Sequence, residues 1–554
     1  MSAERIIFWM YFISLALLAA ALPLSMFMMS VAQFALVGVM IVDGMNRQEA
    51  LNLFQNSSPL KVALLTVPLG IWWIFKSIAY KLRNFFARDN IPAIIFCSIY
   101  FIHAIGLLYT EDINYALKDL RIKSPLVILP VVLSTTGKLN RLNFRHLMGI
   151  FIAGVIAATL ITGYYYFTRD FSDVRNISVF ISHIRFSLMI CISVYILMYW
   201  ITRKNQIHVF WKAVSLAAMI WMIIYLIMVT SITGIVIIML TGFILVIYIG
   251  FQPRRKLFAR ILLLTGSLII PFMIGWYVFN IMKDVYHVDP VDLKALDQAT
   301  ASGNPYFHDT INGQVENGHY VWIYLAENEL REAWNSRSDL RYDSLDLAGQ
   351  EIKYTLIRFL SSKGYRKDAD GVQKLTEQEI RMIEEGTASV VYELKNPIYV
   401  RIYQIIWEYK RYQETGNPSG HSVMQRFEYW KASWGIIKDH WFTGVGTGDL
   451  NAAYTEQYQK MGTQLDDQFR WRAHNQFLAI LVGLGFMGLA FFLLSLLYPP
   501  LYYRRFSDYY YLTFFVIIVL SMLPEDTLET QAGLTLYAFF SSVYLFAKSF
   551  HDPV

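Results

Sequence analysis

Cysteine and charged residues are both scarce in this sequence, and each scarcity argues against a class of protein. Only 2 of the 554 residues are cysteines, Cys97 and Cys191, and both fall in apolar runs. Neither a disulfide framework nor a cysteine metal site is implied. Charged residues make up 16% of the chain and hydrophobic residues 55%, against about 25% and about 45–50% in ordinary soluble domains. A soluble enzyme of this size is disfavoured.

Several motifs that carry chemistry are also missing. The sequence has no Gly-x-Ser-x-Gly nucleophile elbow, no phosphate-binding Gly-Lys-Ser/Thr loop and no pair of histidines with the spacing of a zinc site. Internal repeats, low-complexity tracts and the paired repeats typical of transporters are not visible either. We therefore expect no metal and no cofactor.

The charge is unevenly distributed along the chain. From Lys283 to Arg472 there are 22 Lys and Arg against 28 Asp and Glu, although the whole chain has a net charge of +6. Outside this acidic segment the basic residues form short clusters between apolar runs. Such clusters indicate membrane topology, so no nucleic-acid partner is expected.

The apolar runs predict an all-α polytopic membrane protein with about twelve transmembrane helices. Each run is long enough, or nearly so, to span a bilayer. The first run lacks an evident cleavage site and is predicted to be a retained helix. The predicted spans are residues 6–27, 29–43, 91–109, 121–136, 147–167, 185–202, 210–230, 232–251, 258–282, 474–502, 508–523 and 531–548.

The basic clusters set the predicted orientation. By the positive-inside rule, the clusters are cytoplasmic, and twelve spans place all of them on one side together with both termini. These clusters are residues 76–88, 138–145, 203–212, 254–260 and 504–505. The segments that then face outward are 110–120, 168–184, 283–473 and 523–532. Residues 60–80 would break this parity, so we expect an interfacial or re-entrant helix there, the alternative being that residues 29–43 fail to cross.

Three domains follow from this layout: a membrane domain at 1–282, an outward loop at 283–473 and a second membrane domain at 474–554. The loop is too long to be a simple connection. Its mixed polar and apolar runs have helical spacing and are separated by Asn-Gly, Lys-Gly and Asn-Pro breaks, so it is expected to be mostly helical.

Four outward places combine reactive side chains with membrane proximity. His474 follows Arg470 and Arg472 at the head of an apolar helix, and a neutral imidazole there can act as a base, although Trp, Arg and His are also common interfacial anchors. Arg185 follows His183 at the start of another span and would bind an anion or simply snorkel. Glu525, Asp526 and Glu529 form the third place, a carboxylate-rich turn. The fourth is a turn with glycines at 444, 446 and 448, whose backbone N–H groups would approach an anion unless the turn is only a flexible connection.

Taken together, two stretches of sequence resemble the bacterial O-antigen ligase/polymerase family. They are Arg426…Trp430…Gly444-Val445-Gly446-Thr447-Gly448 and His474-Asn475-Gln476-Phe477-Leu478…Gly485…Gly488, joined across a long outer loop. The layout of spans resembles the family over most of the chain, and the residues match best from about 421 to 490. The closest likeness is to the ligases.

The resemblance implies a GT-C-like glycosyltransferase with a periplasmic loop between spans nine and ten, in the bacterial inner membrane. The implied donor is an undecaprenyl-pyrophosphate-linked glycan, and the implied acceptor is a sugar hydroxyl of lipid A-core in lipopolysaccharide biosynthesis. The reaction would be inverting, would need no metal, and would take place among membrane lipids.

The family's functional residues carry over to His474 as the general base and to Arg426 as a pyrophosphate ligand. The arginine that the family has after a serine at the eighth span is missing from Ser231-Ile232-Thr233-Gly234, and we expect Arg185 to supply the second phosphate contact. Arg472 is expected to add to the same anion site. Supporting roles are expected for Asn475, His183, Trp430, Gly446, Gly448 and Glu529.

Two alternatives remain open at the level of sequence. An O-antigen polymerase would use the same donor with a second lipid-linked glycan as acceptor, although a single dominant outer loop favours the ligase. A lipid-linked oligosaccharide transporter would need ionisable residues near the middle of the membrane, and these are scarce.

Overall fold

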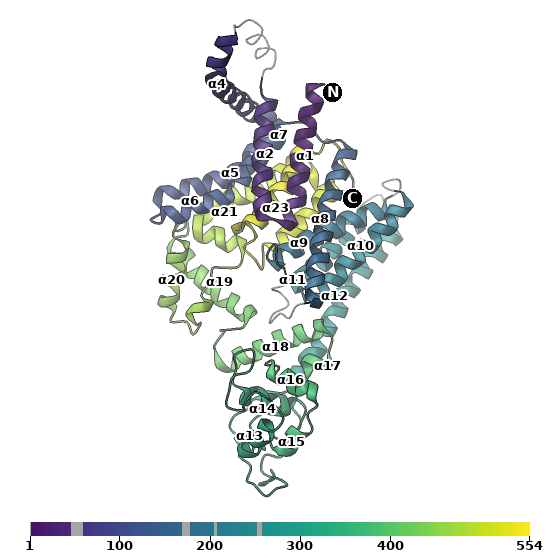
Figure 1. Ribbon diagram of the computed structural model, residues 1–554, viewed down its shortest axis with the longest axis vertical. Coiled ribbons are helices and arrows are strands. Elements are labelled where there is room, and N and C mark those ends of the chain that lie inside the picture. Colours follow the sequence, from purple (N-terminus) through teal and green to yellow (C-terminus); the bar gives the residue numbers. More distant parts are fainter. Residues whose placement is uncertain (1, 46–58, 169–177, 204–207, 252–256) are drawn as a thin grey trace. The chain divides into compact units, whose positions relative to one another are not determined.

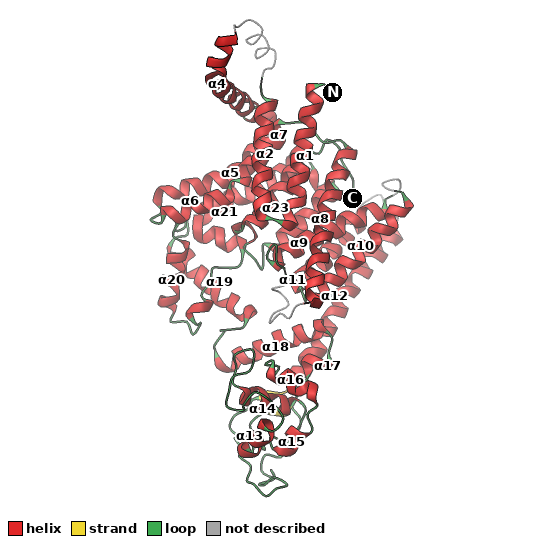
Figure 2. Cartoon of the chain, in the orientation of Figure 1, coloured by secondary structure: helices red, strands yellow, loops and turns green. Residues whose placement is uncertain are grey.

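The computed structural model describes residues 2–45, 59–168, 178–203, 208–251 and 257–554, and nearly all regular structure in these ranges is helical (Figures 1 and 2). The chain divides into two compact units. Unit 1 comprises Met1–Arg260 and Asn417–Val554, and unit 2 comprises Ile261–Gly416. The predicted outward segment 168–184 and the basic clusters 203–212 and 254–260 lie partly outside the described residues.

Unit 1 is built from fifteen named α-helices within the described ranges. They are α1 (Ala3–Leu24), α2 (Met26–Asp43), α4 (Pro59–Phe85), α5 (Ile91–Ile105), α6 (Ile113–Lys123), α7 (Pro125–Thr135), α8 (Arg141–Thr168), α9 (His183–Thr202), α10 (Val209–Met228), α11 (Ile232–Gly250), α19 (Ser422–Asp439), α20 (Leu450–Met461), α21 (Gln476–Tyr502), α22 (Tyr509–Ser521) and α23 (Gln531–Ser542).

Within the described residues, nine helices are long and apolar enough to cross a membrane. They cover Ala3–Leu24, Met26–Asp43, Arg88–Tyr109, Arg141–Thr168, His183–Thr202, Val209–Met228, Ile232–Gly250, Leu257–Tyr286 and Gln476–Tyr502. Each coincides with one of the twelve predicted spans. The other three predicted spans form shorter helices, so the count of twelve crossings stays a prediction.

Local sequence explains why those three helices are short. The run 121–136 is divided at Ser124, because Pro125 has no N–H and begins a new helix, α7. α22 begins after Asp508, whose side chain accepts hydrogen bonds from the N–H groups of Tyr510 and Tyr511. The residues between α22 and α23 fold into a loop and the short 3-10 helix η6 (Thr527–Glu529).

The predicted interfacial segment at residues 60–80 is part of α4, a 27-residue helix. Only the side chains from residue 70 onward are described, and several of them are apolar and exposed, including Trp72 and Phe75. Whether α4 lies at the interface or crosses the membrane stays a prediction.

The core of unit 1 lies around α9, whose apolar stretch is more than four-fifths buried. α8, α10, α11 and α22 pack against it. α21 packs lengthwise against α5 (Figure 1) and contains one break, because Gly485 has φ 63° and ψ −164°, a conformation open only to glycine. This break lies nine residues after the head of α21 and shapes the site described below.

Unit 2 is a small helical body with its own core. Its elements are most of α12 (Leu257–Tyr286), the antiparallel pair β1 (Val315–Glu316) and β2 (His319–Tyr320), and the helices α13 (Glu327–Asn335), α14 (Ile352–Ser362), α15 (Ala369–Gln373), α16 (Glu377–Glu384), α17 (Val391–Leu394) and α18 (Pro397–Thr415). Its core contains Trp334, Tyr342, Phe359 and Leu360, all fully buried. Regular structure in 283–473 is helical apart from β1 and β2, but residues 287–314 contain no helix, so the prediction of a mostly helical loop is met only in part.

The boundaries of the compact units differ from those of the predicted domains. Residues 417–473 were assigned to the loop with 283–416, but they pack within unit 1. The reason is that α19 contacts α21, so this part of the loop shares a core with an apolar helix. The packing of residues 417–473 does not determine the side of the membrane, so the periplasmic position of 283–473 stays a prediction.

Candidate functional site

Residues 470–473 of unit 1 follow the 3-10 helix η4 (Asp467–Phe469), begin in an extended conformation at Arg470 and lead into His474. Side chains of α19 and α20 hold the carbonyls of every second residue from 469 to 473. Each donates to one carbonyl oxygen: Tyr429 to Phe469 at 2.8 Å, Tyr458 to Trp471 at 2.7 Å and Trp430 to Ala473 at 3.0 Å. The expected supporting residue Trp430 therefore holds the backbone next to His474.

His474 itself has a strained backbone. Its φ is 44°, in the left-handed region that residues with a Cβ rarely adopt. The next residue, Asn475, caps α21 by accepting a hydrogen bond from the N–H of Leu478 at 3.0 Å, and its amide donates to Leu523 O at 2.8 Å. The chain turns at His474 from the extended segment into a capped helix, and this turn fixes the direction of the imidazole. Strain of this kind persists where surrounding contacts enforce it, which is common at active sites.

The carboxylate-rich turn is attached to the same helix head. The N–H of Gln476 donates to Met522 O at 2.9 Å, and its side-chain amide binds both Leu528 N and Glu529 Oε1, at 2.7 and 3.0 Å. Residues 522–529 therefore lie against the start of α21. As a result, Glu525 and Asp526 are placed beside His474.

Three predicted site residues from distant parts of the sequence meet at Glu525. Arg426 Nη2 lies 2.8 Å from Glu525 Oε1, and Arg185 Nη1 lies 3.2 Å from Oε2. His474 Nδ1 lies 3.6 Å from the same Oε2, a contact too long for a hydrogen bond. Arg185 also pairs with Asp526 at 3.4 Å, and His474 Nδ1 is 3.9 Å from that carboxylate.

The three cationic or basic side chains differ in exposure. The His474 side chain is 34% exposed and that of Arg426 is 25% exposed, whereas Arg185 is only 9% exposed. Arg426 is anchored by its other nitrogens, which donate to Pro524 O and Ser422 O at 3.3 Å. A ligand approaching this cluster from solvent would reach His474 and Arg426 before Arg185.

The two carboxylates respond differently to this environment. Burial alone would raise the pKa of Glu525, but the neighbouring His474, Arg185 and Arg426 hold it below its ordinary value. Burial raises the pKa of Asp526, and Glu529 adds to that effect, against His474, Arg185 and Arg472. Glu525 is thus the firmly ionised partner of the cluster, and Asp526 takes up a proton more easily.

Arg472 belongs to a neighbouring cluster rather than to the Glu525 contacts. Its Nη1 donates to the Tyr115 hydroxyl at 2.9 Å. Burial would lower its pKa, but the charge of Glu529 raises it above the ordinary value. Glu529 in turn binds Lys123, which is fully buried between Glu529 Oε2 and Asp119 Oδ1 at 2.8 and 2.6 Å. Lys123 and Asp119 gave no signal in the sequence, because Lys123 lies 406 positions before Glu529, the residue that it supports.

The glycine turn has a structural role, and the expectation of free N–H groups is wrong there. The N–H groups of Gly444, Gly446 and Gly448 donate to His440 O, Gly483 O and Thr110 Oγ1, at 3.0, 2.9 and 2.9 Å. The turn also supplies partners for backbone groups that the break in α21 would leave unpaired: Trp441 O and Phe442 O accept from Phe486 N and Met487 N. A packed turn of this kind is neither an anion cradle nor a flexible connection.

Arg185 lies next to the stretch in which the family's arginine is missing. Ser187, half a turn further along α9, shares a hydrogen bond of 2.7 Å with Ser231 at the start of α11. The Cys191 thiol donates to Gly234 O from the following turn of α9. The head of α9 therefore lies beside Ser231–Gly234. The role of Arg185 as a second phosphate contact stays a prediction. His183 begins α9 and is half-buried.

The site also offers ligands that a metal ion could use. Among the described residues, His474, Glu525 and Asp526 form a group whose ligand atoms lie within 4.8 Å of one another. Both carboxylates already pair with guanidinium groups, and a divalent cation would have to approach Arg185 and Arg426 closely. The arrangement suits an anion bound by arginines better than a cation bound by carboxylates.

Comparison with known proteins adds one finding. Residues 387–493 match the family described as O-antigen ligase. The matched range contains Arg426, Trp430, the glycine turn and His474, whereas Arg185 and Glu525 lie outside it. No curated protein matches the chain. The family and the many apolar helices together indicate a multi-pass membrane protein.

Proposed function

Because residues 387–493 match the family described as O-antigen ligase, we propose that the protein is a glycosyltransferase-type enzyme of O-antigen assembly and, more closely, the ligase itself. It transfers a glycan from undecaprenyl pyrophosphate to a sugar hydroxyl of lipid A-core on the periplasmic face of the inner membrane. The observation that carries this proposal is the meeting of His474, Arg426 and Arg185 at one buried carboxylate, Glu525.

The reaction breaks the bond between the anomeric carbon of the glycan and the pyrophosphate oxygen. The electron pair of that bond goes to the leaving undecaprenyl pyrophosphate, and the acceptor oxygen forms the new bond to the anomeric carbon from the opposite face. Negative charge develops on the leaving group, and fixed guanidinium groups stabilise it. Arg426 is placed for direct contact, and Arg185 supplies a second positive charge from a more buried position.

His474 accepts the proton that the acceptor hydroxyl loses. Its Nδ1 faces the carboxylates of Glu525 and Asp526, so the other ring nitrogen, Nε2, is the one that takes the proton. The imidazolium that results is stabilised by Glu525, which its basic neighbours keep ionised against the opposing effect of burial. This division of roles follows the logic by which a carboxylate orients a histidine base and compensates its charge.

A reconstituted transfer assay tests the proposal. The full-length protein is placed in vesicles with a lipid-linked glycan donor and lipid A-core, and glycan-capped lipid A-core is measured by gel shift. His474→Ala should lower the rate about 10²–10⁴-fold, and Arg426→Ala should lower it about 10²–10³-fold because one oxyanion contact is lost. A chelator should not change the rate.

Matched control variants separate loss of chemistry from loss of fold. His440→Ala alters an exposed histidine at the end of α19, and Arg411→Ala alters a half-buried arginine of α18 that pairs with Glu414. Both should transfer glycan as the wild type does. Undiminished transfer by His474→Ala would contradict the assigned base. Polymer formed from two lipid-linked glycans, with no capping of lipid A-core, would instead identify a polymerase.

A further inference from the structure

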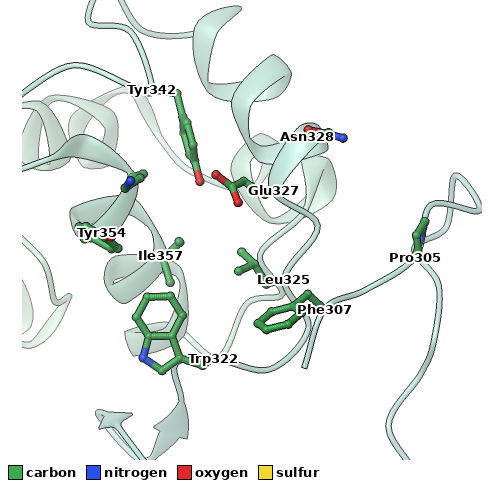
Figure 3. Close-up of a pocket in the computed structure, with 10 residues that line it drawn as sticks. Pro305, Phe307, Trp322, Leu325, Glu327, Asn328, Tyr342, Tyr354 and Ile357 are labelled. Atoms are coloured by element: carbon green, nitrogen blue, oxygen red, sulfur yellow. The ribbon is translucent and has the colours of Figure 1, made fainter. Parts of the chain in front are cut away.

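Unit 2 contains a pocket of about 600 Å³, within the range of about 300–1,000 Å³ in which small-molecule sites are found. It lies where α13 and α14 meet the loops before them, and all its lining residues belong to unit 2 (Figure 3). Leu325 and Ile357 form part of its lining and are buried. The pocket is independent of the His474 site, which lies in unit 1.

One side of the pocket presents aromatic rings to solvent. Phe307 is 61% exposed and Tyr354 is 46% exposed, although both are large apolar residues of a folded domain. Trp322 lies edge-on to Tyr354 at 6.2 Å between ring centroids, and its indole N–H is held by Gln314 Oε1 at 3.0 Å. Trp322 is thus held in place beside the uncovered rings of Phe307 and Tyr354, an arrangement that indicates a binding surface.

The other side presents polar groups. Tyr342 is fully buried, and its hydroxyl has no hydrogen-bond partner among the described residues. Glu327 and Asn328, both exposed, stand at the first turn of α13. Figure 3 shows the Tyr342 hydroxyl and the Glu327 carboxylate close together on one side of the pocket, and the rings of Trp322 and Phe307 on the other side. An unpartnered buried hydroxyl is costly, so its orientation towards the pocket points to a ligand that carries hydrogen-bonding groups.

We propose that this pocket binds a glycan, a segment of the polysaccharide that the enzyme transfers. A pyranose ring has a face of C–H groups that stacks on an aromatic ring and a rim of hydroxyl groups that both donate and accept hydrogen bonds. The aromatic side fits the first, and the Tyr342 hydroxyl, the Glu327 carboxylate and the Asn328 amide fit the second. The inference rests on the proposed function for the identity of the sugar polymer.

Such a pocket changes how the enzyme handles long donors. A polysaccharide of many repeats can occupy the pocket with one repeat while another part of the same molecule bears the reactive end. A second contact on one molecule raises the effective concentration of the first. The pocket therefore increases the apparent affinity for long lipid-linked glycans and contributes nothing to the chemical step.

Binding of a glycan without its lipid and pyrophosphate isolates this contact. The probe is O-polysaccharide released by mild acid from the lipopolysaccharide of the producing strain, titrated calorimetrically into the full-length protein in detergent. Wild type should bind it saturably. Phe307→Ala should weaken binding about tenfold through loss of a stacking ring, and Tyr342→Phe should weaken it about threefold to tenfold through loss of one hydrogen bond.

Two further variants make the result decisive. Ile311→Ala removes an apolar side chain that is 96% exposed and lies outside the pocket, and it should bind as the wild type does. His474→Ala should also keep wild-type affinity, so a failure of the proposed chemistry leaves this measurement intact. Tyr342→Phe removes a single oxygen that has no partner in the protein, and its melting curve should match the wild type. Absence of saturable binding, or equal affinity in Phe307→Ala, Tyr342→Phe and wild type, overturns the proposal.

Discussion

Glu525 is the residue through which the charges of the site are linked. One of its oxygens contacts Arg426, and the other contacts both Arg185 and His474. A buried carboxylate surrounded in this way favours its charged form in the folded protein more than in the unfolded chain. Folding and the ionisation of Glu525 are therefore coupled.

This coupling predicts a dependence of stability on pH. The pKa of Glu525 is lower in the folded protein than its ordinary value of 4.5, so its stabilising contribution is fully present above about pH 4.5 and is lost as the pH falls through the folded-state pKa. Melting temperatures measured at pH 7 and pH 4 should show a drop in the wild type. Glu525→Gln should melt lower at pH 7 and lose part of that drop.

The exposed pair of Glu456 and Lys460 on α20 provides the comparison. Glu456→Gln removes a carboxylate that solvent screens, so its melting temperatures should follow those of the wild type at both pH values. An unchanged difference between pH 7 and pH 4 in Glu525→Gln would contradict the coupling.

Residue chemistry in the sequence identified only part of the site. His474, Arg426 and Arg185 were selected by residue type and side of the membrane, and they meet at Glu525. Their shared partner could be seen only as one of several carboxylates in a turn, because a linear sequence does not reveal which charges will be paired. The glycines at 444 and 446 suggested N–H groups available to an anion, but these groups bind main-chain carbonyls instead. Glycine permits both arrangements, because the absence of a side chain also lets two backbones touch.

Among the secondary-structure elements, the head of α21 and the η6 turn behave as one piece. Gln476 joins them, and Lys123 at the end of α6 joins Glu529 of η6 to Asp119. Because Glu525 and Asp526 precede η6 directly, whatever holds η6 also holds the carboxylates that face His474. Lys123 is thus a positioning residue for the site.

Removal of the Lys123 charge should therefore affect both stability and turnover. Lys123→Met removes the cation that Asp119 and Glu529 share in a buried position, a loss of about 3–5 kcal/mol in comparable buried pairs. Melting curves should show a clear decrease, and transfer should slow at saturating substrate because the carboxylates near His474 lose their support. Lys460→Met, which removes an exposed charge from α20, should change neither. Equal melting of Lys123→Met and wild type would remove Lys123 from this role.

Hydrophobic patterning predicted the existence of helices better than their lengths. All nine helices that are long and apolar enough to span in the described chain fall on predicted spans. The run 121–136 was predicted as one span, although Pro125 was visible, because proline also occurs inside membrane helices. α22 and α23 follow their predicted spans closely, since α22 covers Tyr509–Ser521 and α23 continues through the π-helix Val543–Ala547. The contacts of the loop between them with α21 are tertiary, and no local pattern reports them.

At the scale of the whole molecule, the sequence showed which regions are polar but not which regions pack together. Residues 417–473 are as polar as the rest of the predicted loop, yet their aromatic residues Tyr429, Trp430 and Tyr458 bind the segment that leads to His474. The residues that match the family model begin at 387, so the matched range starts in unit 2 and continues into unit 1 at Asn417. Charge and hydropathy do not show which regions pack together, because packing depends on contacts between distant segments.

The predicted orientation can be tested by chemical labelling in cells. Cys97 and Cys191 are both buried, so the native protein should react little with a charged maleimide that crosses the outer but not the inner membrane. Asn312→Cys, in an exposed loop of unit 2, should be labelled in intact cells, because 283–473 is predicted to be periplasmic. Ser2→Cys should be labelled only after lysis. Labelling of Ser2→Cys in intact cells would reverse the predicted topology.

The contact between the glycine turn and the break in α21 limits how this site can change by mutation. A Cβ at Gly444 would lie 2.4 Å from the carbonyl carbon of Gly483, and a Cβ at Gly485 would lie 2.2 Å from the carbonyl oxygen of Phe442. In most packed contacts, a larger residue on one side can be accommodated by a smaller one on the other. Here both clashing partners are main chain, so no side chain exists to be made smaller. Intragenic suppressors of a substitution at either glycine should be absent, and revertants should restore the glycine itself.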